Sequence, residues 1–256
     1  MSPSRLASRT DGPAGAPHVT FSHSLASDLR MWDPQVAALR DSYRILRFDT
    51  RGHGNSPVPP APYSLDDLVG DVVALLDDAG VDQTHFVGLS MGGMIAQGLA
   101  LEHPDRVASI TVANSMAVLP EGAESMWDDR IAIAREQGMV PLADPTIERW
   151  FTADMRAREE SVVAGVRDQI LATSVEGYVG CSEAIKRLDY ASRLGEIDVP
   201  ALFIAGDQDQ GTLAATMRVM HTAVVNSEYV ELGAAHLSNL ERPAEFTAAL
   251  DRFLAL

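Results

Sequence analysis

Hydrophobic positions along the chain fall into two alternating patterns. Short runs rich in Val, Ile, Leu and Phe are bounded by polar or glycine-containing turns, which is typical of buried strands. These runs occupy residues 19–21, 43–49, 84–87, 107–112, 199–205 and 229–232. Between most of them, apolar residues recur every three or four positions, as in helices that pack on a sheet. The alternation predicts an α/β fold with a mainly parallel sheet covered by helices on both faces, and ligand-binding loops beyond the carboxyl ends of the strands.

The clearest helix signal begins at Ser64. Ser64 and Asp67 have the spacing of a capping box, in which each side chain bonds to the backbone N–H of the other residue. The apolar residues that follow lie on one stripe of the predicted helix. They are Leu65, Leu68, Val69, Val72, Val73 and Leu76. We therefore expect this helix to pack against the sheet.

The pattern changes between residues 120 and 195, where helical segments follow one another without a convincing strand. We expect residues 1–119 and 196–256 to form one core domain and residues 120–195 to form a helical cap inserted into it. The insertion is apolar and partly aromatic, with Trp127 and Trp150 among its largest side chains. Packing between helices explains such side chains as well as contact with a ligand does.

Composition narrows the classes of partner. The chain has 256 residues, and its 36 acidic residues against 20 basic ones give a formal net charge of −16, which disfavours binding to nucleic acid or to an anionic membrane. Cys181 is the single cysteine, so no intramolecular disulfide can form. There is no signal-peptide pattern and no apolar run long enough to span a bilayer. We expect a cytoplasmic protein with a small-molecule substrate, and the sequence leaves open whether it forms a homo-oligomer.

A G-x-S-x-G run at Gly88 to Gly92 lies between a predicted strand and a predicted helix. A sharp turn there lifts the serine out of the sheet, and glycine at both ends removes the Cβ atoms that would clash. The helix that follows points its unpaired N–H groups at any oxyanion that forms beside it. Five such residues alone are weak evidence, but the strand-turn-helix context makes Ser90 the candidate nucleophile.

A serine nucleophile needs a base, and the base needs an acid that fixes its tautomer. His236 is the best candidate base, because it follows the last predicted strand in a loop of small residues. Asp207 and Asp209 share the loop after the preceding strand, and the residues alone leave open which of them is the acid. The backbone N–H groups of Met91 and Leu25 are the candidate oxyanion donors. No metal-binding spacing and no phosphate or dinucleotide motif is present, so neither a metal nor another cofactor is predicted.

Several runs of residues together resemble one hydrolase family. The elbow at Ser90 indicates only a hydrolase, whereas three further runs narrow the resemblance. They are D-T-R-G-H-G at residues 49–54, E-R-W-F-T at residues 148–152 and A-H-L-S-N at residues 235–239. With these runs, nearly the whole chain resembles the 3-oxoadipate enol-lactonases, a branch of the α/β-hydrolase superfamily. Relatives usually begin with a further strand pair, and only residues 5–17 resemble its end.

The resemblance implies an α/β-hydrolase fold with Ser90 as nucleophile and His236 as base, and its G-x-x-D pattern places the acid at Asp209. It also implies a cofactor-free enzyme that opens 3-oxoadipate enol-lactone to 3-oxoadipate in the catabolism of aromatic compounds, through an acyl-enzyme. Candidates for holding the substrate lie in the insertion. They are Trp127, Arg130, Arg149 and Trp150. The same residues also fit a related carboxylesterase, another lactonase or a cofactor-free perhydrolase, and a rival of another class is a receptor that binds its ligand without turnover.

Overall fold

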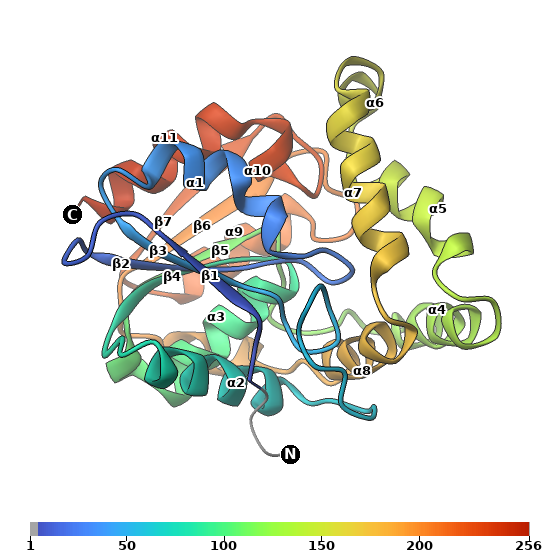
Figure 1. Cartoon of the computed structure of the whole chain (residues 1–256), viewed down its shortest axis with the longest axis horizontal. Helices are drawn as coiled ribbons and strands as arrows, with labels where there is room; N and C mark the ends of the chain where they lie inside the picture. The colour runs from blue at the N-terminus through green and yellow to red at the C-terminus, as the bar shows by residue number, and fades with distance from the viewer. Residues whose placement is uncertain (1–4, 256) are drawn as a thin grey trace.

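The computed structural model describes residues 5–255, and these form a seven-stranded sheet with helices on both faces (Figure 1). The strands are β1 Ser8–Asp11, β2 His18–Ser22, β3 Arg44–Phe48, β4 Thr84–Leu89, β5 Val107–Ala113, β6 Ala201–Gly206 and β7 Ser227–Leu232. Their order across the sheet is β1-β3-β2-β4-β5-β6-β7. All neighbouring strands are parallel except β1 and β3. This confirms the predicted α/β class with a mainly parallel sheet.

The edge strand β1 is the one strand that the hydrophobic pattern did not predict. Its sequence, Ser-Arg-Thr-Asp, is polar, and three of its four residues are exposed. It pairs antiparallel with β3, with Ser8 opposite Phe48 and Asp11 opposite Ile45. The strand lies within residues 5–17, the stretch that resembles the end of the family's first strand pair. Because backbone pairing defines this strand, its side chains carry no hydrophobic signal.

Two groups of helices cover the sheet. The helices α1, Asp33–Leu39, and α11, Pro243–Leu254, lie together on one face, whereas α2, Leu65–Asp78, and α3, Met91–Glu102, cover the other (Figure 1). The helix α9, Ala214–Ala223, packs on β6 and β7. The remaining core elements are short: α10, Ser238–Glu241, and the 3-10 turns Leu29–Trp32, Pro104–Arg106 and Ala191–Glu196. At the start of α2 the predicted capping box is present, with both hydrogen bonds between Ser64 and Asp67.

Five helices follow one another between β5 and β6, and they stand to one side of the sheet (Figure 1). They are α4 Glu124–Gln137, α5 Val140–Trp150, α6 Ala153–Arg158, α7 Glu160–Ala172 and α8 Val175–Lys186. Val118 and Asp189 pair antiparallel where the chain leaves the core and returns. The backbone of α8 packs closely on the loop after β3, since a Cβ atom at Gly177 would lie 2.1 Å from the carbonyl oxygen of Gly52. We refer to residues 120–195 as the cap.

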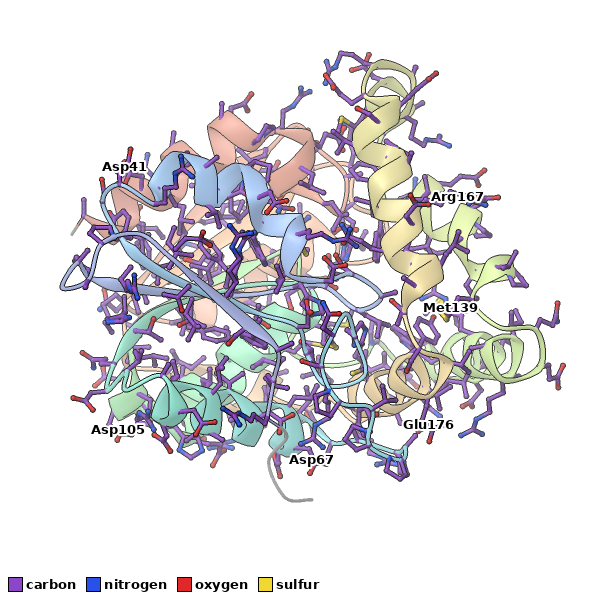
Figure 2. All side chains as sticks on the ribbon, in the orientation of Figure 1. Asp41, Asp67, Asp105, Met139, Arg167 and Glu176 are labelled. Carbon is purple, nitrogen blue, oxygen red and sulfur yellow. The ribbon has the colours of Figure 1, made fainter. Side chains whose placement is uncertain are left out.

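The main hydrophobic core lies between the sheet and its covering helices. On the α1 and α11 face, the Trp32 ring packs between Phe21 and Phe246, with ring centroids 4.7 and 6.0 Å away. Charged side chains such as Asp41 and Asp105 point outward at the periphery (Figure 2). Within residues 5–255, no helix combines the length and the hydrophobicity needed to cross a bilayer.

Candidate active site

Ser90 occupies the sharp turn between β4 and α3. Its backbone has φ 58° and ψ −116°, a conformation that a residue with a side chain adopts only under constraint. Added Cβ atoms at Gly88 and Gly92 would lie 2.0 Å from the Gly92 carbonyl oxygen and 2.2 Å from the Ser22 carbonyl oxygen. Both glycines are therefore required by close backbone contact. The N–H of Ser90 donates to the carbonyl of Ala113 at the end of β5, at 2.8 Å, which anchors the turn to the sheet.

Asp209 and His236 meet from two neighbouring loops, after β6 and after β7. The Nδ1 atom of His236 lies 2.8 Å from Oδ2 of Asp209. The same Oδ2 atom accepts hydrogen bonds from the Thr212 hydroxyl and from the Asn114 side-chain amide, while Oδ1 accepts from the backbone N–H groups of Gly211 and Thr212. These hydrogen-bond partners of the carboxylate are thus all donors, and they hold the Asp209 side chain in one orientation.

The surroundings of Asp209 favour its charged form. Burial alone raises the pKa of this carboxyl, but His236 and the hydrogen bonds from Thr212 and Asn114 outweigh burial and hold the pKa far below its usual range. A carboxylate accepts from Nδ1–H of His236, which leaves Nε2 free to take a proton. Asp207, the other acid of the loop, is exposed, so the structure brings Asp209 and not Asp207 to the histidine.

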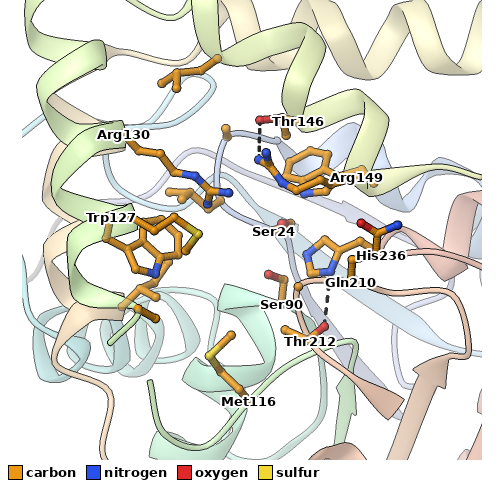
Figure 3. Close-up of a pocket in the computed structure, with 18 of the residues that line it drawn as sticks. Ser24, Ser90, Met116, Trp127, Arg130, Thr146, Arg149, Gln210, Thr212 and His236 are labelled. Carbon is orange, nitrogen blue, oxygen red and sulfur yellow. Dashed lines mark hydrogen bonds between the residues drawn. The ribbon is translucent and has the colours of Figure 1, made fainter. Parts of the chain in front are cut away.

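Ser90 and His236 line one cavity of about 250 Å³. Figure 3 shows both side chains directed into this cavity, with Met116 and Trp127 on its walls. Leu25, in the loop after β2, lines it as well. Met91 is the first residue of α3, and the first N–H groups of a helix have no acceptor within the helix. A carbonyl carbon placed beside Ser90 would therefore share the cavity with the candidate base His236 and with Leu25, and it would lie beside Met91, the residue that follows Ser90.

Two arginines from the cap extend into the same cavity (Figure 3). Arg130 stands over the Trp127 ring at 5.1 Å, and Arg149 donates to the Thr146 hydroxyl at 3.2 Å. Burial, followed by the neighbouring Arg130, lowers the pKa of Arg149. Within residues 5–255 neither guanidinium forms an ion pair with a carboxylate. The cavity wall therefore carries two guanidinium groups without an ion-pair partner among the described residues, and Glu148 offsets only part of the effect of burial and Arg130 on Arg149.

The cap also contacts the loop that holds His236. The Trp150 ring stacks on the His236 ring, with centroids 5.8 Å apart and planes 27° apart. The Trp150 carbonyl accepts a hydrogen bond from the Leu237 N–H at 3.1 Å. Two residues further along the chain, the Thr152 hydroxyl donates to the buried carboxylate of Glu241 in α10. Three consecutive contacts thus join the end of α5 to the histidine loop.

Comparisons with known proteins identify the family. Residues 17–139 match the family model described as the alpha/beta hydrolase fold. Two 3-oxoadipate enol-lactonases of Acinetobacter baylyi are 38% and 34% identical to the chain, over 94% and 97% of it and over 90% and 92% of their own lengths. The crystal structure of the enol-lactonase from Burkholderia xenovorans LB400 is 42% identical, with a TM-score of 0.96 over 99% of this chain and 97% of that chain. The chain belongs to the 3-oxoadipate enol-lactonase family.

Membership of the enol-lactonase family makes the protein a carboxylic ester hydrolase with the α/β-hydrolase fold, and the named relatives support hydrolysis of a lactone. Among the described residues, no three His, Cys, Asp or Glu side chains converge in a way that could hold a metal ion. The single cysteine, Cys181, is a buried free thiol, and burial raises its pKa. The residues that line the cavity include a serine hydroxyl, an imidazole and a carboxylate, which are the side-chain groups of nucleophilic catalysis by serine.

Sequence reasoning did not single out three polar residues of this enol-lactonase site. Asn114 and Thr212 both donate to Asp209, and the Tyr178 side chain lines the cavity near the cap arginines. A usable signal existed for Asn114, because it is a polar residue directly after the apolar run that forms β5. A polar residue at the carboxyl end of a central parallel strand points to the edge where ligands bind. Thr212 lies three positions after Asp209 in the same loop, so its contact with the carboxylate is local. Tyr178 carries no such signal, because only tertiary packing brings it to the site.

Proposed function

We propose that this enzyme opens 3-oxoadipate enol-lactone, a five-membered lactone with a carboxymethyl arm, to 3-oxoadipate in the catabolism of aromatic compounds. The observation that carries the proposal is the pair Arg130 and Arg149, which form no ion pair among the described residues and lie in the same cavity as Ser90 and His236. The names of the relatives in Acinetobacter baylyi and Burkholderia xenovorans support the same substrate.

The two arginines matter because the chain as a whole repels anions. With a formal net charge of −16, the protein needs a local cation to hold a substrate carboxylate. Burial and the neighbouring Arg130 disfavour the charged form of Arg149, and a bound carboxylate offsets both effects. Guanidinium groups also bind carboxylates through paired, charge-assisted hydrogen bonds. A neutral ester gains none of this, so the arginines favour an acidic substrate over a simple ester.

The first half of the reaction breaks the ring. The Ser90 hydroxyl attacks the lactone carbonyl and passes its proton to Nε2 of His236, while Asp209 stabilises the imidazolium. The backbone N–H groups of Leu25 and Met91 bind the oxyanion of the tetrahedral intermediate. Collapse breaks the bond between the carbonyl carbon and the ring oxygen, and His236 protonates that oxygen to give an enol, which becomes a ketone. The leaving group stays attached to the acyl-enzyme because the ester was cyclic.

The second half regenerates the serine. His236 takes a proton from a water molecule that attacks the acyl-enzyme carbonyl, and the same two N–H groups bind the second oxyanion. Collapse releases the Ser90 oxygen, which recovers a proton from His236. The product is a dicarboxylate. The lactone carbonyl becomes a second carboxylate, and the first is the carboxylate of the arm that the arginines already hold. Atoms balance with one water consumed for each lactone opened.

The test is turnover of freshly generated 3-oxoadipate enol-lactone, with p-nitrophenyl acetate for comparison and Ser90→Ala as the inactive control. We expect kcat/KM for the lactone to exceed that for the aryl ester by several powers of ten, and Ser90→Ala to abolish both activities. Equal or faster cleavage of the ester would identify a general carboxylesterase and remove the pathway assignment. Binding of the lactone without turnover of either compound would identify a receptor, and a peracid product formed from acetate and hydrogen peroxide at a higher rate would favour the perhydrolase.

A further inference from the structure

The loop after β2, Ser24 to Leu29, places the candidate oxyanion donor, and we call it the oxyanion loop. All six of its residues are described, and five of their N–H groups bond to an acceptor within the protein. The acceptors are Met31 Sδ for Ser24, His53 Nε2 for Ala26, the Ser24 carbonyl for Ser27, Gln169 Oε1 for Asp28 and Asp49 Oδ1 for Leu29. Among these described groups, the Leu25 N–H is the one with no acceptor, and Leu25 lines the cavity.

The direction of the Leu25 N–H is set by the carbonyl of Ser24. These two groups belong to one planar trans peptide unit, so they point in opposite directions. The Ser24 carbonyl accepts a hydrogen bond from Nδ1 of His23 at 2.7 Å, a short and fully buried contact. Any rotation of this peptide would break that bond. His23, by the shorter of the two hydrogen bonds to this carbonyl, and the Ser27 N–H, at 3.3 Å, together fix the orientation of the peptide unit that carries the Leu25 N–H.

The tautomer of His23 follows from its second contact. Its Nε2 atom accepts the backbone N–H of Thr50 at 2.9 Å, so the ring proton must lie on Nδ1 and point at Ser24. The contacts form a chain of donors, from Thr50 through the imidazole and the Ser24 carbonyl to the Leu25 N–H. Hydrogen bonds in such a chain polarise one another, so a carbonyl that accepts from His23 makes the N–H of its own peptide a stronger donor.

His53 restrains the next peptide unit in the same way. Its Nε2 atom accepts the Ala26 N–H at 3.0 Å, and its Nδ1 atom lies 3.2 Å from the Arg51 carbonyl. Ala26 has a φ of 58°, a left-handed conformation that a residue with a Cβ atom rarely adopts without such a restraint. The His23 and His53 rings are buried together, with centroids 5.3 Å apart. Two imidazoles thus hold the two peptide units on either side of Leu25.

We propose that His23 is a positioning residue of the hydrolytic reaction: through the Ser24 carbonyl it aims and strengthens the Leu25 N–H that binds the oxyanion. His53 supports it by fixing the following peptide. The inference rests on one part of the proposed function, namely that Ser90 attacks a carbonyl group and that an oxyanion forms. It does not depend on which ester or lactone is the substrate.

The experiment compares His23→Leu with His23→Asn on p-nitrophenyl acetate and on the lactone. Leucine fills the space but donates no hydrogen bond, so we expect kcat to fall roughly 30- to 300-fold with KM changed less than about threefold. Asparagine retains an N–H donor near the position of Nδ1, and we expect it to restore kcat to within about tenfold of the wild type. The matched control is His85→Leu, a half-buried histidine of β4 that bonds to Ser109 and lies outside the cavity. It should leave kcat unchanged.

A second measurement separates positioning from a general loss of structure. A trifluoromethyl ketone adds to the serine and places an oxyanion in the hole, so its Ki should rise in His23→Leu in proportion to the fall in kcat/KM. A fall in kcat/KM with an unchanged Ki, or an unchanged kcat in a folded His23→Leu enzyme, would overturn the inference while leaving the lactonase proposal intact. Wild-type turnover of the aryl ester without the lactone would instead remove the substrate assignment, and the comparison of His23 variants on the ester would still stand.

Discussion

One wall of the cavity is formed by the core domain and the other by the cap, and the two walls differ in how many of their polar groups have a hydrogen-bond or ion-pair partner. On the core wall, Asp209 accepts from every donor around it, and five of the six N–H groups of the oxyanion loop are bonded. On the cap wall, Arg130 and Arg149 have no carboxylate partner among the described residues, although Arg158 and Arg167 elsewhere in the cap are ion-paired. The difference teaches that the groups assigned to bond breaking are fixed before a ligand arrives, whereas recognition is completed by the ligand itself.

The largest effect is expected on the core wall, when the carboxylate that pairs with His236 is removed. Asp209→Asn removes the charge that stabilises the imidazolium, so we expect kcat to fall about 10³- to 10⁴-fold on both the lactone and p-nitrophenyl acetate. Steady-state kinetics of the purified variant measures it. Asp207→Asn is the matched control from the same loop, because that side chain is exposed, and it should stay within about twofold of the wild type. An inactive Asp207→Asn with an active Asp209→Asn would reverse the assignment.

A smaller and more selective effect is expected on the cap wall. Arg149→Met removes a charge-assisted contact to the substrate carboxylate, so KM for the lactone should rise roughly 10- to 100-fold. The neutral p-nitrophenyl acetate has no carboxylate, and its kinetics should change less than about threefold. Arg167→Met, which removes an arginine that already pairs with Asp144, provides the control within the cap. Equal losses on both substrates would mean that Arg149 shapes the cavity and does not recognise charge.

The two buried histidines of the core wall predict how stability depends on pH. Burial lowers the pKa of His23, and burial together with the neighbouring His23 lowers the pKa of His53 to about 3. The hydrogen bonds to the carbonyls of Ser24 and Arg51, and the charge of Asp28, oppose these shifts but are smaller. The unfolded chain binds these protons below about pH 6.5 and the folded chain does not, so folding stability falls as the pH drops below that value. The upper limit for each histidine is about 1.4 kcal/mol per pH unit, reached well below pH 6.5.

Urea unfolding of the wild type and of His53→Gln at pH 7, 6 and 5 measures this dependence. Glutamine does not titrate, so the free energy of unfolding of the variant should decrease less between pH 7 and pH 5, by roughly 1 to 2 kcal/mol, than that of the wild type. The comparison uses the difference between the two proteins, because groups away from the His23 and His53 pair titrate equally in both. Parallel curves would show that His53 binds its proton similarly in the folded and unfolded chains.

The sheet was predictable where burial shaped the sequence. The strands β2 to β7 each carry a short stretch rich in apolar residues, and the capping box of α2 is a local pattern, so both could be recognised without a structure. The edge strand β1 could not, because three of its four residues face solvent and only its backbone pairs with β3. Hydrophobic patterning reports burial, and a polar edge strand has little of it.

The candidate site, like the sheet, was predictable in part from the sequence. Ser90, Asp209 and His236 each follow a strand, and the structure brings them to one cavity, while their catalytic roles stay predictions until they are measured. The residues alone did not separate Asp207 from Asp209, because only the turn of the loop decides which side chain faces the histidine. The support from Asn114 depends on a contact with Asp209, 95 positions away, and the tautomer of His23 depends on Thr50, 27 positions away, and local patterns record neither contact.

The contacts between the cap and the histidine loop determine which segments must be exchanged together when such enzymes are recombined. Thr152 and Glu241 are 89 positions apart in the chain, yet the buried carboxylate of Glu241 depends on that hydroxyl, as the Leu237 N–H depends on the Trp150 carbonyl. A cap transplanted from another hydrolase without a matching donor would leave a buried charge short of a partner. The E-R-W-F-T run, the A-H-L-S-N run and α10 therefore depend on one another structurally, and a chimeric enzyme should take all three from the same parent.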